Sequence, residues 1–170
     1  MSLVERRLMP QAIECEQCLL GGLIMDPARM DDVDPLMLPT DFYRPDHSAL
    51  YLLIRQMRDA GESVDLPSVA ERVSRGGRDQ EYGGLAYVIG LIEATPSTAN
   101  LGHYATTIAD HARRRRFIAT LQRFTAAAYD AHADVAELTE QAEREIRALA
   151  AGRTDAEEFA NLKEVVAAVA

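Results

Sequence analysis

The chain has 170 residues, of which 48% are hydrophobic and only 6% aromatic, and its formal net charge at pH 7 is −9. An acidic balance argues against sequence-independent binding to phosphate backbones, which depends on clustered lysine and arginine. No signal segment opens the chain, and no apolar stretch approaches the roughly 18 residues that span a bilayer, so we expect a cytoplasmic protein.

Alanine, leucine, arginine and glutamate dominate the composition, while runs of β-branched residues are scarce. These residues favour helices over strands. We therefore expect an all-α fold, in which a compact multi-helix globular head is followed by an antiparallel helical hairpin and the start of a linker helix. Residues 1–9 are interpreted as a leader.

The first predicted helix covers residues 11–25 and has Leu20 and Ile24 on one apolar stripe. Gly21 and Gly22 interrupt this stripe, and each costs about 1 kcal/mol relative to alanine in a helix. Small residues at such a position let two helices approach closely. We therefore expect another helix to cross at the glycine pair.

Three prolines limit residues 31–45 to one short helix and an irregular connection. The next helix begins near Asp46, and Asp65 caps the helix after it. Two glycine pairs then precede a helix that begins near Leu85. Together these elements predict a globular head over residues 10–101.

Residues 102–150 have a different character, because no glycine or proline occurs between Gly102 and Gly152. Only residues 132–134 resemble a turn, which predicts a helical hairpin. The first arm carries five arginines and no acid between Asp110 and Asp130, whereas the second arm carries four glutamates. Opposite charges across the hairpin would mainly set its register, since an exposed pair contributes only about 0–1 kcal/mol.

Residues 151–170 read as a polar linker that leads into a further helix. Asn161 and Glu164 have the spacing of a capping box. The apolar stripe behind them consists of Leu162, Val165, Val166 and Val169. Such a stripe needs a partner, so we expect further chain beyond Ala170.

No residue pattern in the chain predicts catalysis, a cofactor or a metal. The only lysine, Lys163, follows a leucine, so the Gly-Lys pair of a P-loop is missing. Cys15 and Cys18 supply only two of the four ligands that a structural zinc site needs. A thioredoxin-like redox motif would follow a strand, and none is predicted here, so we expect both cysteines simply to pack within a helix. His47 is expected to be a hydrogen-bonding residue of the first helical turn or the core.

The run from Arg113 to Arg116 allows two interpretations. Four successive side chains fan around a helix at about 100° per residue, so they cannot all face one groove, which favours solvated or protein-interface positions. The alternative is a stand-alone helical module that binds single-stranded DNA through the Arg113–Arg123 stretch. A steep dependence of affinity on salt would identify it.

Four segments in order carry a resemblance to a known family. They are Gln11-Ala-Ile-Glu-Cys-Glu-Gln-Cys-Leu-Leu-Gly-Gly-Leu, Asp41-Phe-Tyr-Arg-Pro-Asp-His, Gly83-Gly-Leu-Ala-Tyr and Thr95-Pro-Ser-Thr-Ala-Asn. In order and spacing they resemble the N-terminal domain of the bacterial replicative DNA helicase, the DnaB family. The likeness covers residues 10–150.

The resemblance implies a helical head and a hairpin that pairs between subunits to build a collar on a hexameric ring. It implies that a RecA-like ATPase domain, which binds ATP and Mg, follows the linker, so that this chain itself is not an enzyme. It also implies a place in the cytoplasmic replisome. The expected partners are further copies of the chain, the C-terminal domain of primase and a helicase loader, with DNA contacted only indirectly.

We expect the protein interfaces on the hairpin, residues 102–150, because apolar anchors flanked by charges suit such surfaces. The apolar candidates lie on both arms, and two arginines are candidates for the rim. These residues are Phe117, Leu121, Phe124 and Tyr129 on the first arm, Val135 and Leu138 near the tip, and Arg114 and Arg115 at the rim.

Overall fold

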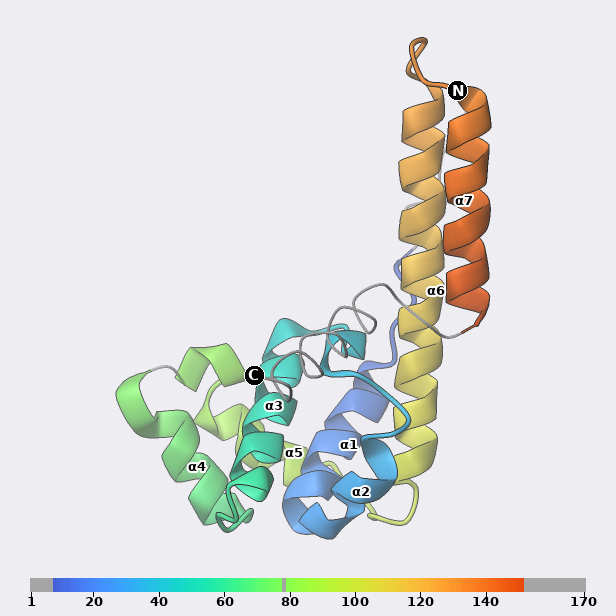
Figure 1. Ribbon diagram of the computed structural model, residues 1–170. Helices are drawn as coiled ribbons and strands as arrows, with labels where there is room; N and C mark the ends of the chain where they lie inside the picture. The colour runs from blue at the N-terminus through green and yellow to red at the C-terminus, as the bar shows by residue number, and fades with distance from the viewer. Residues whose placement is uncertain (1–7, 78, 152–170) are drawn as a thin grey trace, which may run out of the picture. The chain divides into compact units, whose positions relative to one another are not determined.

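The computed structural model describes residues 8–77 and 79–151 (Figure 1). Every regular element in these ranges is helical, which confirms the all-α prediction. Most of the expected leader and nearly all of the expected linker lie outside the described residues. The elements are α1 (Ile13–Met25), η1 (Pro27–Arg29), α2 (Met30–Val33), η2 (Pro39–Asp41), α3 (Pro45–Asp59), α4 (Leu66–Ser74), η3 (Arg75–Gly77), η4 (Asp79–Tyr82), α5 (Leu85–Glu93), α6 (Leu101–Ala128) and α7 (Val135–Ala150).

The chain divides into two compact units, residues 1–112 and 113–170. The division falls inside α6, whereas the expected domain boundary lies at the start of that helix. The physical reason is that the first turns of α6 bury Leu101, Ala105 and Ile108 in the core of the first unit. The described residues up to 112 are named the head below, and residues 113–151 the hairpin.

The head is built from helices that each bury one apolar face. The apolar stripe of α3, which consists of Leu50, Leu53, Ile54 and Met57, is buried along its whole length. Most of the surface of α1 is buried as well, because α1 lies between several neighbours. The largest fully buried aliphatic side chains of the head are Leu19, Leu20, Leu23, Met30, Leu50, Ile54, Met57, Leu91, Leu101 and Ile108.

The predicted close crossing at the glycine pair of α1 is present. A Cβ atom on Gly21 would lie 2.2 Å from the Thr95 hydroxyl oxygen and 2.3 Å from the Leu91 carbonyl oxygen at the end of α5. A Cβ atom on Gly22 would lie 2.4 Å from a methyl group of Leu101, the first residue of α6. The glycine pair therefore lets both later helices of the head pack directly on the α1 backbone.

We expect Gly21→Ala to destabilise the chain by about 1–3 kcal/mol, because the new methyl group meets backbone that cannot rotate away. The matched control is Gly90→Ala in α5, where a Cβ atom would have no neighbour within 4 Å. That control should stabilise the chain by up to about 1 kcal/mol through helix propensity. Urea unfolding followed by circular dichroism measures both, and an unchanged Gly21→Ala midpoint would contradict the crossing.

The hairpin consists of the second part of α6 and the antiparallel helix α7, which lie side by side in Figure 1. Asp134 caps α7, since its carboxylate accepts hydrogen bonds from the backbone N–H groups of Ala136 at 2.8 Å and Glu137 at 3.4 Å. This agrees with the predicted turn over residues 132–134. None of the hairpin residues described is fully buried.

The two arms of the hairpin carry the predicted charge complementarity. Arg123 of α6 forms an ion pair with Glu145 of α7. A further ion pair, between Arg147 and Glu143 at 3.0 Å, lies within α7. Among the residues placed by the structure, no helix has the length and apolar character needed to cross a membrane.

Candidate functional site: a buried polar network and an apolar hairpin face

A buried carboxylate links three segments of the head. The side chain of Glu16 on α1 is 1% exposed, and its Oε2 lies 2.6 Å from Nδ1 of His47, which is also buried. Its Oε1 accepts a hydrogen bond of 2.7 Å from the backbone N–H of Tyr43, just before α3. Glu16 therefore anchors the approach to α3 and the first turn of that helix on α1.

The other nitrogen of the His47 ring reaches α5. Its Nε2 lies 2.7 Å from the hydroxyl oxygen of Tyr87, and that oxygen also accepts a hydrogen bond of 2.9 Å from Nε2 of Gln17. The rings of His47 and Tyr87 are stacked, with centroids 5.8 Å apart and an angle of 10° between the planes. The network therefore holds α1, α3 and α5 together through one imidazole.

One arrangement of protons satisfies every member of this network. A neutral His47 donates from Nδ1 to the Glu16 carboxylate, and the Tyr87 hydroxyl donates to Nε2 while accepting from Gln17. A doubly protonated ring would instead donate at Nε2 and leave the Tyr87 proton without an acceptor among these groups. The hydrogen-bond geometry fits a ring with a proton on Nδ1, which faces the carboxylate.

An ion pair at the edge of the network extends it toward the surface. Arg44 forms two hydrogen bonds with the carboxylate of Asp46, one of them 3.0 Å between Nε and Oδ1. These bonds hold the pKa of Asp46 below its usual value. The Arg44 guanidinium also lies 4.9 Å from the centre of the Tyr87 ring, which it covers.

The order acid, imidazole and hydroxyl resembles that of a hydrolytic triad, but the chemistry does not follow. The Tyr87 hydroxyl already has two hydrogen-bond partners, and its ring packs flat against His47 and beneath Arg44. A nucleophile must present a free lone pair to a substrate. The network is therefore a structural clamp, as predicted for His47. Its partners Glu16 and Tyr87 were not predicted, although both lie in the segments that carry the family resemblance.

We expect Tyr87→Phe to destabilise the chain by about 1–3 kcal/mol, because it removes a hydrogen-bonding partner from the buried His47 and from Gln17. Tyr129→Phe is the matched control, since Tyr129 is 86% exposed. The control should change the free energy of unfolding by less than about 0.5 kcal/mol. Thermal unfolding compares the two variants, and equal midpoints would show that the clamp contributes nothing to stability.

The two cysteines do not form a reactive pair. Both are free and half-buried on α1. Burial is the main cause that raises the pKa of each thiol, and the charge of Glu14 adds to it. A raised pKa keeps the thiols protonated and unreactive. Within the described part of the chain, no cluster of three or more metal-ligating side chains occurs.

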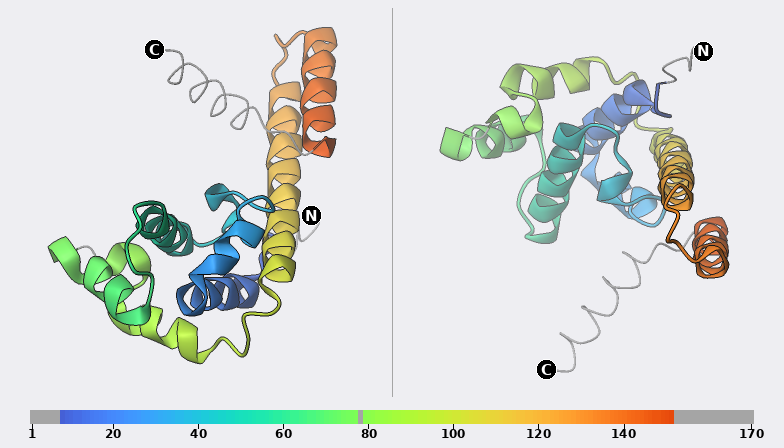
Figure 2. Two further views of the ribbon diagram at one scale, coloured as in Figure 1. Left: turned by 60° about the horizontal axis from the view of Figure 1, so that its bottom comes forward. Right: turned by 90° about the horizontal axis from the view of Figure 1, so that it is seen from above.

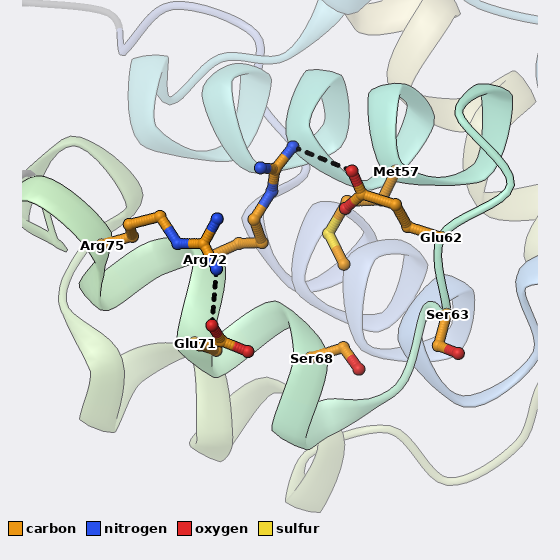
Figure 3. Close-up of a pocket in the computed structure, with 7 residues that line it drawn as sticks. All are labelled: Met57, Glu62, Ser63, Ser68, Glu71, Arg72 and Arg75. Atoms are coloured by element: carbon orange, nitrogen blue, oxygen red, sulfur yellow. Dashed lines mark hydrogen bonds and ion pairs between the residues drawn. The ribbon is translucent and has the colours of Figure 1, made fainter.

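A polar pocket of about 400 Å³ lies between the end of α3 and α4 (Figure 3). Two arginines line it, but each is paired with an acid: Arg72 with Glu62 at 3.5 Å and Arg75 with Glu71 at 2.6 Å. The charges of these four residues cancel, so the pocket shows no preference for an anion or a cation. Its remaining lining residues are Met57, Ser63 and Ser68.

The structure leaves most of the predicted apolar interface residues accessible. Phe117 and Leu121 are 43% and 41% exposed, and Tyr129 and Val135 are 86% and 73% exposed. Phe124 and Leu138 are half-buried between the two arms. The apolar residues of each arm spread over a wider part of the helix surface than the other arm can cover. The contact between the two arms therefore buries only some of them.

The overhanging apolar residues share one face of the hairpin. On α6, Phe117 and Leu121 lie beyond the half-buried contact residues, and on α7 Val135 and Ile146 do the same. Projected at about 100° per residue along two antiparallel helices, both overhangs fall on the same side. We name Phe117, Leu121, Val135 and Ile146 the apolar face; Ile146 was not among the predicted interface residues.

The arginines of the hairpin are distributed around it. Arg114 is exposed and Arg115 is half-buried, as the fan of successive side chains predicts. Arg123 pairs with Glu145, and its guanidinium lies 4.9 Å from the centre of the Phe124 ring. The pairing of Arg123 supports a structural role for it. Binding of single-stranded DNA through this stretch stays an untested alternative.

A family model described as the DnaB-like helicase N-terminal domain matches residues 8–110. The chain is 30% identical over 164 residues to the replicative DNA helicase DnaB of Geobacillus stearothermophilus. It is 31% identical over 164 residues to the replicative DNA helicase DnaC of Bacillus subtilis. Each alignment covers 96% of this chain and 36% of the relative, so the chain spans about a third of the length of these relatives.

Two solved structures are similar to the fold. The N-terminal domain of DnaB helicase from Mycobacterium tuberculosis is 35% identical, with a TM-score of 0.75 that covers 82% of this chain and 99% of that one. A DnaB-like replicative helicase, described with its interactions with primase, is 19% identical, with a TM-score of 0.61 over 91% of this chain and 34% of that one. The second likeness shows the fold alone. The chain belongs to the DnaB replicative helicase family, of which it contains the N-terminal domain.

Proposed function

We propose that this chain is the collar domain of an ATP-dependent replicative DNA helicase, which self-associates through its hairpin and recruits primase during DNA replication in the cytoplasm. A helicase loader is a second proposed partner. The chain itself would hold no cofactor, because ATP and Mg would bind to the ATPase domain of the longer protein. Contact with DNA would be indirect.

The apolar face of the hairpin is the observation that carries the self-association. A pair of helices can bury only the seam between them, and here the seam leaves Phe117, Leu121 and Val135 in contact with water. The opposite side of α6 presents small or polar residues such as Ala119, Gln122 and Ala126. A hairpin with one apolar and one polar side is suited to pair with a second copy, as in a four-helix arrangement.

The proposed recruitment of primase rests on family membership and on the lack of a recognisable catalytic motif. The domain has no P-loop and, in its described part, no metal cluster, so its surface is what it can contribute to replication. One of the similar structures is that of a helicase described with its interactions with primase. A surface that binds other proteins is the function that this combination supports best.

We expect the double variant Phe117→Gln and Leu121→Gln to weaken self-association by about tenfold or more, because each loses an apolar anchor from the proposed interface. Sedimentation equilibrium of the full 170-residue chain measures the dissociation constant. Both residues are more than 40% exposed, so the fold of the monomer should be retained.

The matched control for that variant is Ala119→Gln with Ala126→Gln, which places the same side chains on the opposite side of the same helix. The control should self-associate like the unmodified chain. Equal dissociation constants for the two double variants would remove the apolar face as the interface.

Titration of the self-associated chain with the C-terminal domain of its cognate primase tests the recruitment. Calorimetry should show saturable binding with a dissociation constant in the micromolar range or tighter, which corresponds to about −8 kcal/mol or better. The absence of heat at several temperatures, with both proteins folded and the chain oligomeric, would contradict the proposal.

A further inference from the structure

Most of the apolar face of the hairpin lies near the C-terminal end of α7. Figure 2 shows this end of α7 beside the middle of α6, and the ion pair that Arg123 forms with α7 sets the register of the two helices. Counted from that pair, Phe117, Leu121 and Ile146 lie within or roughly level with the last two turns of α7. Val135 lies at the other end of that helix. Three side chains, each between 37% and 43% exposed, therefore share one short stretch of surface.

The surface around these three side chains is strongly basic. Residues 113–123 and 143–151, named the base of the hairpin below, contain seven basic and two acidic side chains. The chain as a whole is acidic, with a formal net charge of −9. A surface that is both apolar and positive favours an occupant that is apolar and negative.

The segment that follows α7 has both of these properties. Residues 152–170 lie outside the described part of the chain, and their sequence contains four acidic and two basic side chains. The helix predicted at their end carries an apolar stripe, which consists of Leu162, Val165, Val166 and Val169. The sequence of this segment therefore complements the base of the hairpin in polarity and in charge.

The lengths of the two parts also match. At 1.5 Å per helical residue, the stripe from Leu162 to Val169 is about 11 Å long, whereas Phe117 and Leu121 are about 6 Å apart along α6. Residues 152–160 connect α7 to the stripe and can span up to about 30 Å when extended. Packed helices lie only about 8–10 Å apart, so this connection is long enough for the chain to turn back onto the base.

We propose that residues 161–170 dock on the base of the hairpin of their own chain and cover Phe117, Leu121 and Ile146 until a second hairpin displaces them. This inference rests on the proposed self-association and adds its regulation, because the segment and the second copy compete for the same side chains. A short tether gives the segment an effective concentration in the millimolar range. At micromolar concentrations of the chain, the base is therefore covered by its own segment rather than by that of another copy.

Self-association of the full 170-residue chain measures this competition. Leu162→Gln with Val166→Gln removes the centre of the stripe and frees the apolar face, so self-association should tighten by about tenfold. That factor corresponds to docking that leaves about a tenth of the chains free to pair. Sedimentation equilibrium measures the dissociation constant.

The matched control is Ala167→Gln with Ala168→Gln, which places the same side chains on the other side of the predicted helix. The control should self-associate like the unmodified chain. Equal dissociation constants for the two double variants would contradict the competition.

A fluorescence probe detects the docking within single chains. The chain contains no tryptophan, so Phe117→Trp introduces one indole at the base of the hairpin. Below the dissociation constant of self-association, its emission should shift to longer wavelength when Leu162→Gln and Val166→Gln are added, because the indole then meets water. Adding the control pair Ala167→Gln and Ala168→Gln should leave the emission unchanged.

The possible outcomes separate the docking from the proposed function. If the emission of the probe is the same with and without the stripe, the docking is wrong, whether or not the chains self-associate. If loss of the stripe weakens self-association, the segment joins copies of the chain and docking within one chain is wrong. If the emission shifts but no variant self-associates, the proposed self-association falls, and the competition falls with it.

Discussion

The Glu16 carboxylate is the point on which the packing of the head depends. A buried carboxylate is costly unless hydrogen bonds replace the water that it loses. Here the replacements come from the backbone before α3 and from the ring of His47, which passes the connection on to Tyr87 of α5. Because each donor comes from a different segment, the hydrogen bonds are complete only when α1, α3 and α5 are all in place. The network thereby links α1, α3 and α5 to one another.

The glycine pair of α1 also fixes how the helices of the head pack, because it leaves room for close approach. Gly21 allows the end of α5 to lie on the α1 backbone, and Gly22 does the same for Leu101 at the start of α6. The Thr95 hydroxyl, which would collide with a methyl group on Gly21, donates to the Leu91 carbonyl and closes the end of α5. The four segments that carry the family resemblance therefore meet in two neighbouring contacts, the polar clamp and the glycine crossing. Their role is to place the helices.

The head and the hairpin differ in how completely each buries its own apolar side chains. The head buries a continuous core, whereas the described hairpin contains no fully buried residue. An apolar arc wider than the seam between two helices has to be covered by something else, and this is why the hairpin is proposed to pair with a second copy. The exposed apolar residues of the hairpin are the feature on which its proposed self-association rests.

The sequence by itself determined the helices, the turn before Asp134, the cap at Asp65 and the glycine crossing, because these follow from local spacing and backbone preferences. It also determined the family, through four short segments in order. Only the tertiary structure decided that Glu16, His47 and Tyr87 share one network, since hydrogen bonds between residues 31 and 40 positions apart leave no periodic trace. It likewise decided that Phe117 and Leu121 remain exposed while Phe124 turns toward the second arm. A stripe shows which residues are apolar, but the diameter of the neighbouring helix sets how many of them are covered.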